Sequence, residues 1–187
     1  MRLHLFLPSL LWVFASCASA QVRPGDAQLE SYLPLLEEKR VGVVSNHTAV
    51  IHGENGHHAH LIDTLLALGV NVSAAFGPEH GFRGDLPDGA HAEDGTDPTT
   101  GIPVHSLYGT HKKPTTAQLE NLDILLFDIQ DVGLRCYTYL STLMLAMEAC
   151  AEQGLPLIVL DRPNPNGHLV AGPVLDTAQF RSFVGFL

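Results

Sequence analysis

Residues 124–161 read ILLFDIQDVGLRCYTYLSTLMLAMEACAEQGLPLIVLD, and this stretch decides the fold class. The apolar run 124–127 predicts a buried strand, and the apolar pattern over 139–153 predicts a helix that ends at the following glycine. A second short apolar run, 157–160, then predicts another strand. A strand, a long helix and a second strand are typical of a parallel sheet, because parallel neighbours need a long crossover connection.

The same alternation of strands and helices extends toward the N-terminus. Further strands are predicted at 41–44 and 70–76. Further helices are predicted at 29–36, 60–68 and 115–121. Pro34 is expected to bend or split the first of these helices, and Thr115 and Gln118 have the spacing of a capping box. Short strands that are apolar throughout indicate a mostly parallel sheet covered on both faces, which is a three-layer α/β domain.

Composition excludes two broad classes of protein. Ten Lys and Arg residues stand against 20 Asp and Glu residues, for a net charge of -10, and nucleic-acid partners require the opposite balance. A hydrophobic content of 45% is too high for a disordered chain. No stretch after the N-terminal region is apolar for long enough to span a membrane.

Residues 1–20 have the pattern of a secretory signal peptide. Arg2 supplies the positive charge, residues 3–14 the apolar run and Ala18-Ser19-Ala20 the cleavage site. Lipoprotein processing at Cys17 is the alternative to plain cleavage. We therefore expect a periplasmic or secreted protein whose domain covers residues 21–187.

Two cysteines remain after the signal peptide, Cys136 and Cys150. An exported protein could join them in a disulfide. Cys150 falls in the apolar pattern of the predicted helix over 139–153, however, and a free buried thiol is the commoner finding there. We expect it to be free.

Polar residues follow each of the four predicted strands. Because the carboxyl ends of parallel strands meet at one edge of a sheet, and ligands of open α/β sheets bind there, we expect these residues to form one site. The four segments are SNHT (45–48), GPEHGFRGD (77–85), DIQDVG (128–133) and DRPNPNG (161–167).

Glu79 is the best candidate for a catalytic acid, because it lies in a glycine-bounded turn on this edge. Its alternative roles are to cap the turn or to pair with Arg83. Asp128 and Asp131 offer the second carboxylate that glycoside hydrolysis usually requires. One of the two is expected to be structural, accepting backbone N–H groups at the start of the next helix.

Arg135 and Arg162 could bind an anionic group of a substrate, or they could balance the same aspartates. Tyr137 and Tyr139 could form a wall for a sugar ring, or they could pack in the core. The remaining candidates for substrate binding are Asn46, His47, His80, Arg83, Gln130 and Asn164.

Four histidines, His52, His57, His58 and His60, raise the possibility of a metal site. They lie in a glycine-rich stretch without the spacing of a zinc-protease helix, so a solvated loop is the favoured interpretation. Neither glycine-rich turn matches a phosphate-binding fingerprint. We expect no metal and no other cofactor.

Several long stretches of the chain resemble one family, the NamZ-type exo-β-N-acetylmuramidases. The stretches are VGVVSNHTAV, FGPEHGFRGD, TGIPVHSLYG, LLFDIQDVGLRCYTYLSTL, VLDRPNPNG, GPVLD and FRSFVG. The resemblance implies a Rossmann-like N-terminal domain, a smaller C-terminal domain and an active-site cleft between them. It also implies release of N-acetylmuramic acid from the non-reducing ends of peptidoglycan fragments, with the glutamate of GPEHG, here Glu79, as catalytic residue.

The chain departs from this family at two points. It ends shortly after FRSFVG, so we expect residues 21–187 to be the N-terminal catalytic domain without its C-terminal partner. Ala171 also stands where the family carries an acidic residue. The alternative is therefore a muramyl-sugar-binding module without catalytic activity, or an inactive fragment.

Overall fold

A computed structural model describes residues 22–53, 58–84 and 93–185 of the chain. The predicted signal peptide, including Cys17, lies outside these residues, as does His57. The signal peptide and the placement of His57 in a solvated loop therefore stay predictions. Within the described part, no helix is long and apolar enough to cross a membrane.

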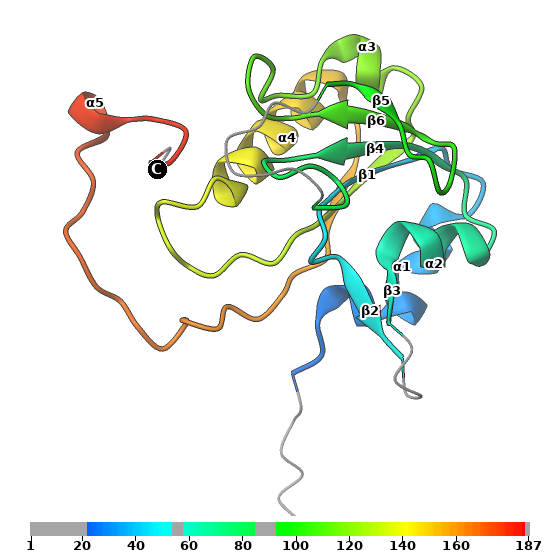
Figure 1. Cartoon of the computed structure of the whole chain (residues 1–187), viewed down its shortest axis with the longest axis horizontal. Coiled ribbons are helices and arrows are strands. Elements are labelled where there is room, and N and C mark those ends of the chain that lie inside the picture. The colour runs from blue at the N-terminus through cyan, green and yellow to red at the C-terminus, as the bar shows by residue number, and fades with distance from the viewer. Residues whose placement is uncertain (1–21, 54–57, 85–92, 186–187) are drawn as a thin grey trace, which may run out of the picture.

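A six-stranded sheet forms the centre of the domain, in the order β5-β6-β4-β1-β7-β8 (Figure 1). All neighbours in it are parallel except β5, which pairs antiparallel with β6 at one edge. The strands are β1 (Val41–Ser45), β4 (Val72–Gly77), β5 (Gly95–Thr96), β6 (Pro103–Ser106), β7 (Ile124–Asp128) and β8 (Leu157–Val159).

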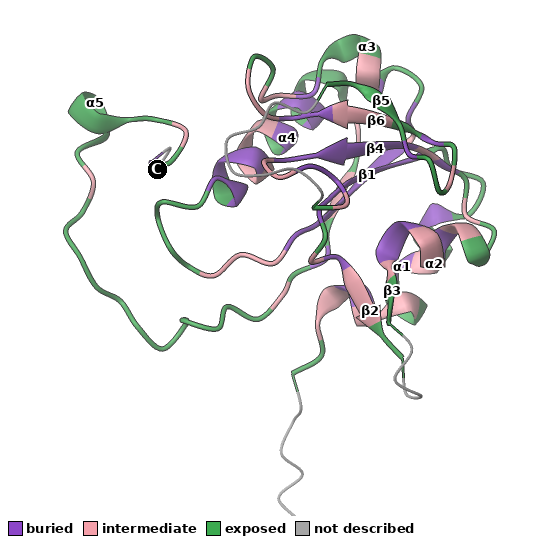
Figure 2. Cartoon of the chain, viewed as in Figure 1, coloured by how far each residue is buried: buried purple, intermediate pink, exposed green. Residues whose placement is uncertain are grey.

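Helices cover both faces of this sheet, which confirms the predicted three-layer α/β fold. Val43 and Leu126 point toward the helices α1 (Leu29–Leu36) and α2 (Leu61–Ala67) in one buried cluster. The next residue along β1, Val44, belongs to a second cluster with α3 (Thr116–Leu119) and α4 (Tyr139–Gln153). Alternate strand residues therefore bury against opposite layers, and Figure 2 shows the central strands β1 and β4 almost entirely buried.

The predicted helices are present with small changes at their ends. α4 has the predicted bounds, and Gly154 ends it in the left-handed conformation at φ +64°. The capping box of Thr115 and Gln118 is formed at the start of α3. Pro34 lies inside α1, which stays one helix of eight residues; the predicted split is absent.

Several short elements escaped prediction because they are brief and lack a clear hydrophobic period. The histidine-rich stretch, expected to be a loop, forms a hairpin of β2 (Val50–His52) and β3 (His58–His60). β5 and β6 lie in a region expected to be loop throughout. A 3₁₀ turn, Gly25–Ala27, and a short C-terminal helix, α5 (Thr177–Phe180), complete the fold.

After β8 the chain becomes mostly exposed and reaches α5 in an extended path (Figures 1 and 2). The end of this segment is tied to α4, where the Ser141 hydroxyl donates to the Phe183 carbonyl over 2.7 Å.

Among the described residues, Cys136 and Cys150 are both free, as expected for Cys150. Cys150 is buried in the α4 layer, and this burial raises the pKa of its thiol to about 11. Cys136 is exposed.

Candidate functional site

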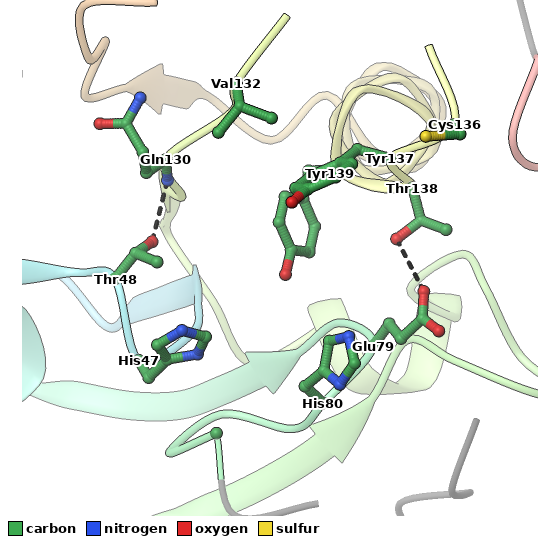
Figure 3. Close-up of a pocket in the computed structure, with 11 residues that line it drawn as sticks. His47, Thr48, Glu79, His80, Gln130, Val132, Cys136, Tyr137, Thr138 and Tyr139 are labelled. Atoms are coloured by element: carbon green, nitrogen blue, oxygen red, sulfur yellow. Dashed lines mark hydrogen bonds between the residues drawn. The ribbon is translucent and has the colours of Figure 1, made fainter. Parts of the chain in front are cut away.

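The loops that follow β1, β4 and β7 meet at one edge of the sheet, as predicted. Val44 is in register with both Phe76 and Phe127, so the three strands end at the same level. A cavity of about 660 Å³ opens there (Figure 3). It is lined by His47, Thr48, Glu79, His80, Gly84, Gln130, Val132, Cys136, Tyr137, Thr138 and Tyr139.

Glu79 is presented to this cavity by a tight turn after β4. The Gly81 amide donates to the Pro78 carbonyl over 3.0 Å, and His80 adopts a left-handed φ of +70°. A side chain at Gly77 would lie 2.8 Å from the backbone nitrogen of Phe82, so the turn requires glycine there. Backbone strain of this kind concentrates at functional sites, where the surrounding structure holds it in place.

Two hydroxyl groups from separate loops hold the half-buried Glu79 carboxylate. The Thr138 hydroxyl, at the start of α4, lies 3.3 Å from Glu79 Oε2 (Figure 3). The Tyr108 hydroxyl, from the loop after β6, also bonds to Glu79, and this bond raises the pKa of Tyr108. Glu79 thus faces the cavity in a fixed orientation, and Arg83, its predicted alternative partner, is engaged elsewhere.

Five other predicted residues line the same cavity: His47, His80, Gln130, Tyr137 and Tyr139. Thr48, which belongs to the predicted SNHT segment but was not named as a separate candidate, lines it too. Its hydroxyl accepts the Gln130 amide over 2.9 Å and bonds to Asn46 Oδ1 over 2.6 Å, so it joins the loops after β1 and β7. Tyr139 packs in the core and also lines the cavity, so both interpretations of it hold.

Asn46 lies beneath the cavity, where it is fully buried. Its carbonyl is 2.9 Å from His60 Nε2 and its Oδ1 binds Thr48. Burial raises the pKa of Tyr139, and the Asn46 amide opposes that rise. Asn46 therefore supports the lining residues from below, which differs from the predicted contact with substrate.

Asp128 and Arg162 lie apart from the residues that line the cavity and pair with each other. Asp128 is fully buried, with its two oxygens 2.5 and 3.0 Å from Arg162 Nε and Nη2. Arg162 Nη2 also lies 2.9 Å from the buried Asp26. Burial raises the pKa of Asp128, and the arginine opposes this. Both residues belong to a buried ion network outside the cavity, because the neighbouring strands β7 and β8 bring them together. Of the two alternatives for Arg162, the structure has the one in which it balances aspartates.

Arg83 is likewise structural. Its guanidinium binds both oxygens of Asp63 at 2.8 Å and reaches Asp97 at 2.8 Å, which fixes the loop after β4 to α2. Its predicted contact with substrate is therefore not supported by its position.

Asp131, Arg135 and Asn164 lie outside the main cavity. Asp131 and Arg135 line a neighbouring cavity of about 400 Å³, which shares Tyr137 with the first. Asp131 accepts the Gly133 amide over 2.6 Å, and Arg135 donates to the Pro173 carbonyl over 2.8 Å. Asn164 accepts the Asn166 amide over 2.9 Å in its own exposed loop.

No metal site is formed by the described residues, none of whose histidines, cysteines and carboxylates gather in groups of three or more. His52 and His58 face each other across the β2–β3 hairpin, with their Nδ1 atoms 2.8 Å apart.

The Arg83 network predicts a loss of stability in acid. Arg83 holds the pKa of the buried Asp97 at about 2, below its ordinary value of 3.8. Because the folded-state pKa is depressed, the stabilisation is complete above about pH 4 and is lost as the pH falls through about 2. Urea unfolding of Asp97→Asn should show lower stability than the wild type at pH 6, with the gap closing toward pH 2. A gap of equal size at both pH values would contradict this assignment.

The chain matches one protein family and is similar to three known proteins. A family described as "Exo-beta-N-acetylmuramidase NamZ, N-terminal" matches residues 41–187. The peptidoglycan beta-N-acetylmuramidase NamZ of Bacillus subtilis (strain 168) is 46% identical over 162 residues, which are 86% of this chain and 38% of that protein.

Two crystal structures of DUF1343 family proteins from Bacteroides fragilis are similar in fold and sequence. Both are 45% identical to the chain, with TM-scores of 0.73 and 0.74. They match 88% and 87% of this chain but 41% and 40% of their own chains. The chain therefore spans about two fifths of the length of these relatives.

Proposed function

The chain belongs to the family of NamZ N-terminal domains, and from this premise we propose that it is a glycosidase domain that releases N-acetylmuramic acid from non-reducing ends of peptidoglycan fragments. The B. subtilis relative is named for activity on peptidoglycan, and the match includes the turn that carries Glu79.

One observation carries the proposal: Glu79 borders two cavities at the carboxyl edge of the sheet and is oriented by two hydroxyl groups. An acid that cleaves a glycosidic bond must reach the oxygen between two sugars. In the proposal Glu79 gives its proton to that oxygen. Asp131, in the neighbouring cavity, orients a water molecule or stabilises the positive charge that develops on the sugar.

The other lining residues suit a carbohydrate. Tyr137 and Tyr139, whose rings meet edge to face at 5.8 Å, offer an apolar surface for one side of a sugar ring. His47, His80 and Gln130 can exchange hydrogen bonds with hydroxyl and acetamido groups. None of these steps requires a cofactor.

Incubation with a muramyl–glucosaminyl disaccharide tests the proposal. The expected result is release of free N-acetylmuramic acid, detected by mass spectrometry. Absence of both release and binding would contradict it.

A muramyl-sugar-binding module is the second candidate, and Ala171 favours it. This residue lines the cavity of Asp131 and Arg135, so an apolar methyl stands where an acid was expected. Calorimetry with N-acetylmuramic acid, run beside the release assay, separates the two functions: binding without hydrolysis selects the module.

The proposed substrate lies outside the cytoplasm, so we further propose that residues 1–20 direct export and that the protein is periplasmic or secreted. Mass spectrometry of the protein recovered from cells tests this. Cleavage after Ala20 is the expected result, whereas a lipid on Cys17 would select the lipoprotein route.

A further inference from the structure

Glu79 also borders a second cavity. It has a volume of about 700 Å³ and shares Glu79, Cys136 and Thr138 with the first cavity. Its remaining walls come from the loop after β6 and from the C-terminal segment, through Tyr108, Gly109, Thr110, Lys112, Ser182, Phe183 and Val184. One carboxylate thus faces two spaces, as cleavage of a bond between two sugars requires.

The two cavities differ in charge. The first has no lysine or arginine among its lining residues, whereas the second contains Lys112. Lys112 Nζ lies 4.6 Å from the centre of the Phe183 ring. Within residues 22–53, 58–84 and 93–185, no carboxylate pairs with it.

The other basic groups near this edge are already engaged. Arg83 and Arg162 each bind two aspartates. Lys113, the next residue, binds Glu148 and Glu152 at 2.8 and 2.7 Å. Arg135 donates to a backbone carbonyl and lines a cavity that does not include Glu79. Among the described residues, Lys112 is therefore the only lysine or arginine that lines a cavity together with Glu79.

We propose that Lys112 binds the lactyl carboxylate of muramic acid and so determines which sugar occupies which cavity. This assignment rests on the proposed function. Muramic acid differs from glucosamine by an ether-linked group that carries a negative charge, and an ammonium group without a carboxylate partner recognises that difference. The acidic sugar then occupies the cavity of Tyr108 and Lys112, and the neutral sugar occupies the cavity of His47 and Tyr139.

Calorimetric titration of the chain with N-acetylmuramic acid and with N-acetylglucosamine tests the assignment. Lys112→Met should weaken binding of N-acetylmuramic acid about tenfold, because it removes a charge-assisted hydrogen bond, and should leave binding of N-acetylglucosamine unchanged. Lys113→Met is the matched control and should change neither. Added salt should weaken binding of the acidic sugar to the wild type more than to Lys112→Met.

Two results would overturn the assignment while the proposed function stands. One is unchanged binding of N-acetylmuramic acid by Lys112→Met. The other is a tenfold loss in Arg135→Met in its place, which would move the carboxylate to the neighbouring cavity. A wild-type chain that binds neither sugar would overturn the proposed function and the assignment together.

Discussion

Glu79→Gln should lower the rate of release of N-acetylmuramic acid from a muramyl–glucosaminyl disaccharide by about 10²–10⁴-fold. Glutamine keeps the shape of the side chain and can still bond to the Thr138 and Tyr108 hydroxyls, but it cannot give a proton to the glycosidic oxygen. Steady-state rates with the disaccharide measure the loss.

A second substrate makes this test specific for the acid. When an aryl muramide carries a highly acidic phenol, the phenolate can leave without a proton. Glu79→Gln should therefore lose much less of its rate with this substrate than with the disaccharide. Glu120→Gln, which changes an exposed carboxylate at the end of α3, should be neutral with both substrates. Disaccharide turnover by Glu79→Gln at the wild-type rate would remove Glu79 from the mechanism.

Arg162→Ala should lower the free energy of unfolding by about 3–5 kcal/mol. The guanidinium lies between Asp26 and Asp128, whose side chains are 2% and 0% exposed, and its removal leaves two carboxylates without a cation. Urea unfolding at pH 7, followed by circular dichroism, measures the difference.

Arg23→Ala provides the control for this effect. Arg23 pairs with Glu30 at 3.0 Å, but both side chains are more than half exposed, so its loss should cost less than about 1 kcal/mol. Equal costs in the two variants would show that burial does not set the strength of the Arg162 network.

The main elements of the fold could be predicted because the strands β1, β4, β7 and β8 are short apolar runs. The hairpin β2–β3 could not, because its residues alternate weakly and its pairing places His52 opposite His58. Pairing between the two strands stabilises such a hairpin, and the local sequence pattern does not indicate that pairing.

The site was predictable as far as it depends on strand ends. His47, Glu79 and Gln130 each follow a strand and meet in one cavity. The choice between the two alternatives for Arg162 could not be predicted, because it depends on β8 lying beside β7, which brings Arg162 to Asp128 inside the domain.

Contacts between loops could not be predicted from the sequence either. Thr138 and Tyr108 meet at Glu79 although they come from different parts of the chain, and no spacing in the sequence indicates this. The same holds for Lys112, whose contact with Phe183 depends on how the C-terminal segment returns to α4.

A crystal structure of Glu79→Gln with the muramyl–glucosaminyl disaccharide would show whether Glu79 lies at the scissile bond, because the variant should bind this substrate without cleaving it. We expect the glycosidic oxygen within about 3 Å of the residue 79 side chain, with one sugar in each of the two cavities that Glu79 borders. A disaccharide bound away from residue 79, or in the neighbouring cavity of Asp131 and Arg135 alone, would contradict it.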